Sequence, residues 1–309
     1  MIDPRRWTAD QLADHRLSSI QVFRTDRLAE PAEVYPDALD RCLSRMEEFI
    51  EGTVDLRKMS VSDLLELVTN ADGMHAFRYL ASPPISEDDL KQLAAVKSLA
   101  PRRLREDPEL IGSLSHVIVS CIDRRRFPWL VDNREPTEEE RNAAIFASAT
   151  LMACQRVQTD RRNLAKTNQE NLIATTLMEC SFEETERRDI ETITDAPAAG
   201  KYCREVKCVT KRADLVVGLW DKRTLLIECK VSNSEVNSFK RLNLETVGKA
   251  NVWNSYLGTS NVVPAAVLSG VFKKENLEEA QRQGVTLFWA HDLTSLRIWL
   301  DAIRQEVTP

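Results

Sequence analysis

The chain has 309 residues, of which 43% are apolar and 29% charged, so it can form one large or two medium domains around a hydrophobic core. Its net charge of −6 argues at first sight against a nucleic-acid partner, but residues 201–249 carry 11 basic and 6 acidic side chains, which suits a basic cleft on an acidic body. The start lacks the apolar core of a signal peptide and no apolar stretch approaches transmembrane length, so we expect a cytoplasmic protein without membrane contact.

Residues 1–158 predict a mainly helical N-terminal region with loops marked by proline. Ser60 and Ser86 precede apolar residues at helical spacing and resemble N-caps. The segment 137–140, Thr-Glu-Glu-Glu, matches a capping box and opens a helix that should reach about Val157. We expect this region to supply dimer contacts, DNA contacts or both.

Residues 159–309 predict a second domain in which helices and strands alternate. In chain order we expect a helix, three strands, a polar helical stretch, a strand, a helix, a strand and a final helix, at 161–180, 202–209, 213–220, 224–231, 235–256, 264–272, 274–283, 285–290 and from about 293. Hairpin strands are antiparallel and helix-linked strands are usually parallel. The order therefore predicts an α/β fold with a mixed sheet flanked by helices.

Two carboxylates and a lysine are expected at one end of this sheet. The runs 213–220 and 224–231 predict a β-hairpin around the polar turn 221–223. Asp214 and Glu228 are equidistant from residue 221, so antiparallel pairing brings them close together. Glu228 and Lys230 lie two apart on one strand and therefore share a face.

Paired carboxylates beside apolar residues are costly unless a cation lies between them, and a hard divalent ion such as Mg²⁺ with oxygen ligands is the usual solution. The ion lowers the pKa of a bound water, and a lysine beside it can orient that water or stabilise charge on phosphorus. Phosphodiester hydrolysis is the chemistry that this set implies.

Asp214, Glu228 and Lys230 resemble the active site of the PD-(D/E)XK nuclease superfamily, an Asp on one strand and Glu-x-Lys on the next; Ala213 stands where a proline is often found. The chain as a whole resembles a type II restriction endonuclease, and the segments YLASPPISEDDL at 79–90 and IECKVSNS at 227–234 resemble the XamI-like family. The resemblance implies a restriction-endonuclease-like core, double-stranded DNA as substrate, and 5′-phosphate and 3′-hydroxyl products.

A second Glu-x-Lys, Glu205-Val206-Lys207, competes with the first. Its nearest upstream acid, Asp195, precedes a loop-forming stretch and has no hairpin partner. We therefore assign that run to the first strand of the sheet. For Asp214, Glu228 and Lys230, the strand context, the position of the turn and the spacing all support a catalytic site. Ordinary charges on a half-exposed strand face are the alternative.

Glu170 precedes the sheet on a helix whose residues Ile173, Ala174 and Leu177 share its side. A carboxylate at the edge of an inward stripe needs a partner. In related restriction enzymes an acid on this helix helps to hold the metal, so Glu170 is a candidate ligand, as is the backbone carbonyl of Cys229. An exposed glutamate paired with Lys166 at i−4 is the equal alternative.

Small polar and basic residues follow the second strand of the hairpin and are candidates for contacts with phosphates or base edges, or else for helix capping and a solvated helix face. They are Ser232, Asn233, Ser234, Lys240, Arg241 and Lys249.

Other catalytic and cofactor sites have no support in the sequence. The seven cysteines are odd in number and lack CxxC spacing, the four histidines form no HxxxH or HxH pair, and neither GxxxxGK[ST] nor GxGxxG is present. We expect no nucleotide cofactor. The sequence thus predicts a Mg²⁺-dependent type II restriction endonuclease, acting as a homodimer if its site is a palindrome. A repair, junction-resolving or structure-specific nuclease, and a non-catalytic DNA-binding or assembly subunit, are the alternatives.

Overall fold

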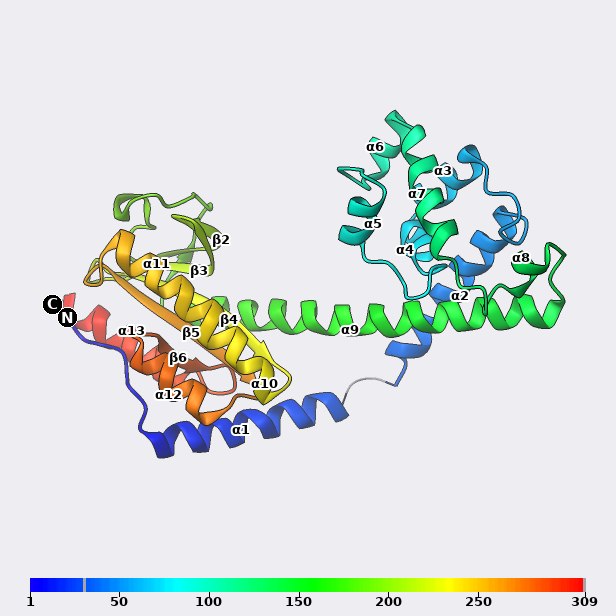
Figure 1. Cartoon of the computed structure of the whole chain (residues 1–309). Coiled ribbons are helices and arrows are strands. Elements are labelled where there is room, and N and C mark those ends of the chain that lie inside the picture. The colour runs from blue at the N-terminus through cyan, green and yellow to red at the C-terminus, as the bar shows by residue number, and fades with distance from the viewer. Residues whose placement is uncertain (30–31, 308–309) are drawn as a thin grey trace. The chain divides into compact units, whose positions relative to one another are not determined.

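A computed structural model describes residues 1–29 and 32–307, and its contacts separate two compact units (Figure 1). The sheet unit comprises Met1–Glu30 with Arg161–Pro309, and the helical unit comprises Pro31–Asp160. The boundary at 160/161 lies close to the division at 158/159 that the sequence suggests, but the first thirty residues group with the sheet unit. Among the described residues, no helix is long and apolar enough to cross a membrane.

The helical unit begins its helices where the sequence places capping residues. Its helices are α2 (Val34–Gly52), α3 (Val61–Thr69), α4 (Gly73–Arg78), α5 (Glu87–Leu93), α6 (Pro101–Glu106), α7 (Glu109–Cys121), α8 (Pro128–Asp132) and the first part of α9 (Glu138–Glu179). The Ser60 and Ser86 hydroxyls accept backbone N–H groups at the starts of α3 and α5. At the start of α9 the Thr137 hydroxyl accepts from the Glu140 N–H at 3.2 Å, and the Glu140 carboxylate accepts from the Thr137 N–H at 2.9 Å, which confirms the capping box.

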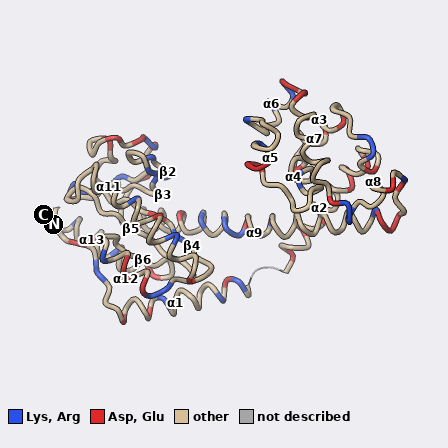
Figure 2. Tube along the Cα trace, in the orientation of Figure 1, with Lys and Arg blue, Asp and Glu red and all other residues tan. Residues whose placement is uncertain are grey.

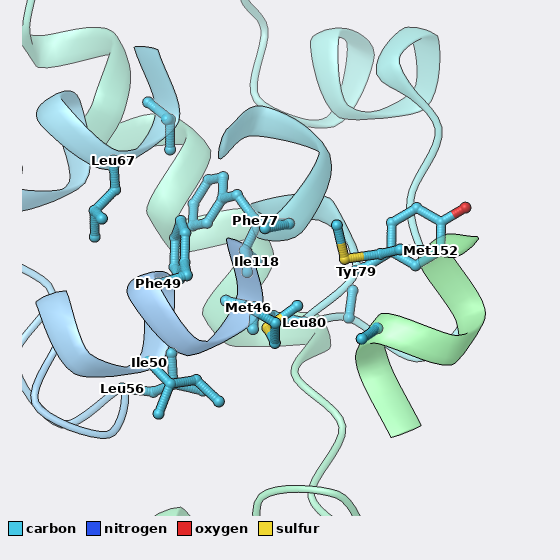
Figure 3. Packing of buried hydrophobic residues seen from close by; sticks show 14 of the residues in the cluster. Met46, Phe49, Ile50, Leu56, Leu67, Phe77, Tyr79, Leu80, Ile118 and Met152 are labelled. Carbon is cyan, nitrogen blue, oxygen red and sulfur yellow. The ribbon is translucent and has the colours of Figure 1, made fainter. Parts of the chain in front are cut away.

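Apolar side chains from several helices fill the core of the helical unit (Figure 3). Met46, Phe49 and Ile50 of α2 pack with Phe77 of α4 and Ile118 of α7, and all five are fully buried. The Phe49 and Phe77 rings lie 5.7 Å apart between centroids. Burying such side chains contributes roughly 1.5–3 kcal/mol each, so this core stabilises the unit without any buried charge.

The long helix α9 corrects one prediction. The change of pattern near Asp160 indicates two helices, and this is wrong, because one helix of 42 residues runs from Glu138 to Glu179. No glycine or proline occurs within that span, so nothing in the backbone stops the helix. Its first part belongs to the helical unit and its last part to the sheet unit.

Six strands form one mixed sheet in the order β1-β2-β3-β4-β5-β6. They are β1 (Glu183–Glu184), β2 (Lys201–Cys208), β3 (Lys211–Gly218), β4 (Thr224–Ser232), β5 (Val262–Gly270) and β6 (Thr286–Trp289). β2–β3 and β3–β4 are antiparallel, whereas β1–β2, β4–β5 and β5–β6 are parallel. The predicted mixed sheet is confirmed; only the short β1, two exposed glutamates without an apolar pattern, was not predicted.

Helices cover both faces of the sheet, which makes the unit an α/β sandwich (Figure 1). The remaining elements are α1 (Ala9–Leu28), η1 (Ile193–Asp195), α10 (Glu235–Ser238), the π-helix η2 (Phe239–Thr246), α11 (Val247–Leu257), α12 (Lys274–Arg282) and α13 (Thr294–Val307). Ile173 of α9 and Trp299 of α13 cluster with Ile227 on one face. On the other, Trp253 of α11 packs with Leu226.

The N-terminal segment is part of this sandwich. The Trp7 indole donates to the Leu287 carbonyl at 2.7 Å, and the Ser19 hydroxyl on α1 donates to the Gly270 carbonyl at 2.9 Å. Both bonds join residues more than 250 positions apart, so local sequence patterns could not reveal them.

Candidate active site

The hairpin of β3 and β4 has the predicted register. Leu215 pairs with Ile227 and Gly218 with Thr224, so the ladder is symmetric about residue 221. The Leu219 N–H closes the turn by donating to the Arg223 carbonyl at 2.8 Å. One further step along this register places Asp214 opposite Glu228.

Asp214 is held by the backbone of the neighbouring strand. Its Oδ2 accepts a hydrogen bond of 2.7 Å from the Cys229 N–H, and its Oδ1 lies 3.3 Å from the ammonium of Lys166 on α9. The residue is only 8% exposed. Since a backbone N–H is a fixed donor, the carboxylate is positioned between β3 and β4 before any ligand binds.

Glu228 is fully buried and faces two lysines. The Lys230 ammonium lies 2.8 Å from Oε2, which confirms that these residues share a face of β4. Lys249 on α11 lies 2.7 Å from Oε1, and its ammonium also donates to the Arg212 carbonyl at 2.7 Å. Burial raises the pKa of Glu228, an effect that the charge of Asp214 increases and the two lysines oppose.

Three carboxylates surround Lys166, and we call them the acidic cluster: Glu170, Glu205 and Asp214. The ammonium lies 2.6 Å from Glu205, 3.2 Å from Glu170 and 3.3 Å from Asp214. Burial alone would lower the pKa of Lys166, but the hydrogen bond to Glu205 and the charges of Asp214 and Glu170 outweigh it, so this pKa is raised. The lysine is therefore a firmly charged cation between the acids.

Glu170 combines the two alternatives drawn from the sequence, because it pairs with Lys166 and also faces Asp214. Its side chain is 13% exposed, and its buried Oε1 has the Lys166 ammonium, at 3.2 Å, as its polar contact. Burial raises the pKa of this carboxyl, which means that the charged form is poorly solvated. Such an oxygen is suited to a cation ligand.

Carboxylate oxygens rather than the nearby thiol would bind a cation here. An oxygen of Glu170, an oxygen of Asp214 and the Cys229 sulfur all lie within 4.8 Å of one another. Burial raises the pKa of the Cys229 thiol so far that it remains protonated, and a thiol is a poor ligand for a hard ion. In a strand the N–H and C=O of one residue point to the same neighbour, so the Cys229 carbonyl is directed towards the β3 side, where Asp214 lies. The carboxylates thus suit a divalent ion with oxygen ligands.

Comparison with known proteins identifies the family. The model of the XamI restriction endonuclease family matches residues 55–289, a span that includes β3, β4 and their acids. The type II restriction enzyme XamI of Xanthomonas campestris pv. amaranthicola is 40% identical over 268 residues, covering 86% of this chain and 97% of the relative. The chain belongs to the XamI restriction endonuclease family. It is accordingly a site-specific restriction endonuclease, and DNA is its substrate.

A solved structure, protein VC1899 from Vibrio cholerae, is similar over 86% of this chain with 13% identity and a TM-score of 0.30. The chain spans 57% of that protein's length. A likeness of this size gives no information about the site.

The candidate DNA contacts after β4 have different surroundings. Ser232 is fully buried and its hydroxyl donates to the Ser234 carbonyl, while Ser234 caps α10 by accepting from the Asn237 N–H. Arg241 donates to the Val231 carbonyl at 2.7 Å. These three residues shape the turn and helix that follow β4.

Asn233 and Lys240 are exposed, whereas Lys249 is engaged by Glu228. Basic residues also occur along α9 and around β2 and β4 (Figure 2).

Sequence reasoning missed two members of this site. Lys166 appeared only as a helical neighbour of Glu170, and Glu205 as part of a rejected motif. Glu205 has a positive φ of 53°, which is uncommon for a residue with a side chain. The β2–β3 register places it opposite Asp214, and its carboxylate reaches Lys166. No local sequence pattern predicts the positive φ of Glu205.

Proposed function

We propose that this restriction endonuclease cuts double-stranded DNA at a short specific sequence by Mg²⁺-dependent hydrolysis, with Asp214, Glu228 and Lys230 as catalytic residues. The observation that supports the proposal is the β3–β4 register: continued one residue beyond the Leu215–Ile227 pair, it sets Asp214 opposite Glu228, and Lys230 lies beside Glu228. The available ligands are buried carboxylate oxygens, and no ionised sulfur is among them. Such a ligand set favours Mg²⁺ over soft metals.

Each residue has a distinct task in this mechanism. Asp214, fixed by the Cys229 N–H, and Glu228 would bind the ion, with the Cys229 carbonyl and Glu170 as further ligands. Bound Mg²⁺ supplies a more acidic water and charge stabilisation at the phosphate. Lys230 donates a hydrogen bond to Glu228 and is the group that would orient the attacking water and stabilise negative charge on the phosphorus centre.

Recognition of DNA is proposed to involve the exposed Asn233 and Lys240 after β4, with further contacts from the helical unit. Ser232, Ser234 and Arg241 would act by shaping that segment, and Lys249 through Glu228. We propose a twofold homodimer, because each strand of a palindrome then meets an identical active site. Hydrolysis of this kind requires no nucleotide cofactor.

The test is replacement of Lys230 by Ala, with cleavage of plasmid and phage DNA measured in Mg²⁺. Loss of a charge-stabilising or proton-transferring group should lower the cleavage rate by roughly 10²–10⁴-fold. Lys207→Ala is the matched control, since Lys207 is the exposed lysine of the second Glu-x-Lys motif and should be dispensable. Unchanged cleavage by the Lys230 variant, or loss of cleavage only in the Lys207 variant, would exclude the mechanism.

A further inference from the structure

The Lys166 ammonium contacts two of the carboxylates that are proposed as metal ligands. Its ammonium lies 3.2 Å from Glu170 Oε1 and 3.3 Å from Asp214 Oδ1, the two carboxylates proposed as ligands from α9 and β3. Oxygens bound to one Mg²⁺ at about 2.0–2.1 Å lie at most about 4 Å apart. Ligand oxygens of Glu170 and Asp214 lie within 4.8 Å of each other, so an ammonium that contacts both residues competes with an ion that would bridge them.

The Lys166 side chain is also free to move away from Glu170 and Asp214. Its side chain is 47% exposed, compared with 11% for Lys230 and 24% for Lys249. Its shortest contact, 2.6 Å, is with Glu205, which lies outside the group formed by Glu170, Asp214 and Cys229. The lysine can thus leave Glu170 and Asp214 without losing its charged partner.

We propose that Lys166 is the internal counter-ion of the metal site: it neutralises Glu170 and Asp214 in the metal-free protein and gives way to the divalent ion, remaining paired with Glu205. The inference rests on the proposed metal-dependent function. Two cations compete for the same oxygens, so Lys166 weakens metal binding while it keeps the empty site from accumulating uncompensated buried charge. In this role it is a positioning residue that acts through Glu170 and Asp214.

The experiment compares Lys166→Met with Lys201→Met in the full chain without DNA. Lys201 is the matched control, because it is 48% exposed and pairs with a single acid, Glu183, at 3.7 Å. Calorimetric titration with Mn²⁺ should show about tenfold tighter binding to Lys166→Met than to wild type, on the order of 1.4 kcal/mol. Lys201→Met and the charge-conserving Lys166→Arg should bind as wild type does.

A second readout does not depend on titration. Without its counter-ion the empty site is less stable, so the melting temperature of metal-free Lys166→Met should fall and Mn²⁺ should raise it further than it raises that of wild type. If Lys166→Met does not fold without metal, Lys166→Gln, which retains hydrogen-bonding capacity, takes its place in both measurements.

Equal or weaker Mn²⁺ binding by the Lys166 variant would overturn the inference, as would an equal gain in the Lys201 control. DNA cleavage by the wild type, measured in parallel, keeps the two proposals apart. Cleavage with no gain in metal affinity leaves the function standing and removes the role of Lys166. A gain in metal affinity without any DNA cleavage supports the role of Lys166 and removes the proposed function.

Discussion

The sheet unit and the helical unit differ in what they bury. Among the described residues, the charged residues that are buried as a whole are all in the sheet unit: Asp214, Arg223, Glu228 and Lys230. The buried polar side chains of the helical unit are the hydroxyls of Thr53, Thr69 and Ser148. Burying charge is costly unless partners compensate it, and apolar replacements are often as stable. The comparison teaches that a buried charge in the sheet unit has to be explained by its partners or by a function.

Within the sheet unit the buried charges are of two kinds. Arg223 has a full set of partners, with its guanidinium bound to Asp221 at 2.7 Å, to Asp3 at 3.1 Å and to the Ile2 carbonyl. Glu228 instead faces two lysines, Lys230 and Lys249, and lies outside the group of Glu170, Asp214 and Cys229. Arg223 therefore joins the β3–β4 turn to the N-terminal segment, whereas Glu228, towards the other end of β4, is one of the residues proposed to be catalytic.

Replacing Arg223 by Met is expected to give the largest change in stability. It leaves the Asp221 carboxylate, 4% exposed, without its buried partner, which typically costs about 3–5 kcal/mol. Urea denaturation followed in the sheet unit should show this loss. The control is Arg282→Met, since the Arg282–Glu279 pair is exposed and should contribute at most about 1 kcal/mol. Equal effects of the two substitutions would contradict the structural role of the buried Arg223–Asp221 pair.

Acid should distinguish the two units through His75. Burial lowers the pKa of His75 on α4 to about 4, and the charge of Arg78 adds to this. The unfolded chain, with an ordinary value near 6.5, then binds the proton first as the pH falls. Stability of the helical unit is complete above about pH 6.5 and decreases on the way to about pH 4, by on the order of 3 kcal/mol.

The measurement is the free energy of unfolding of the helical unit between pH 7 and pH 4. His75→Gln should flatten this dependence, because glutamine does not titrate. His116→Gln, at an exposed position on α7 of the same unit, should leave it as in wild type. A dependence that persists in the His75 variant would assign the acid sensitivity to other groups.

Local sequence patterns predict the features that depend on neighbouring residues, namely the β3–β4 hairpin and the helix caps. The β3–β4 hairpin follows from two apolar runs about a polar turn, and its symmetry about residue 221 fixes which residues face each other. The caps at Ser60, Ser86 and Thr137 follow because a hydroxyl three residues before a backbone N–H satisfies it. The candidates Asp214, Glu228 and Lys230 follow in the same way, because their spacing places them on adjoining strands.

Contacts between distant segments were not predictable from one sequence. Trp7 and Ser19 join the sheet unit through partners more than 250 residues away, and Lys249 reaches Glu228 from another element. The motif of Glu205 has no hairpin acid and therefore predicts no site, yet Glu205 has a positive φ and its carboxylate contacts Lys166. A helix with no internal stop signal, α9, was divided because composition changes along it. Tertiary packing decides the contacts of Trp7, Ser19, Lys249 and Glu205, whereas α9 is continuous because no glycine or proline interrupts it.

The smallest expected effect concerns the helical unit alone. Thr137→Ala removes the hydroxyl that accepts the Glu140 N–H at 3.2 Å, so one backbone donor at the start of α9 loses its partner. Capping substitutions of this type cost about 1 kcal/mol. Because the Arg134–Glu140 ion pair at 2.5 Å stays in place, Thr137→Ala isolates the cap from the charge. Denaturation should show this loss in the helical unit, while the Mn²⁺ affinity of the sheet unit stays unchanged. A change in metal affinity would mean that α9 transmits strain from its start to Lys166 and Glu170. The two units would then not be energetically independent.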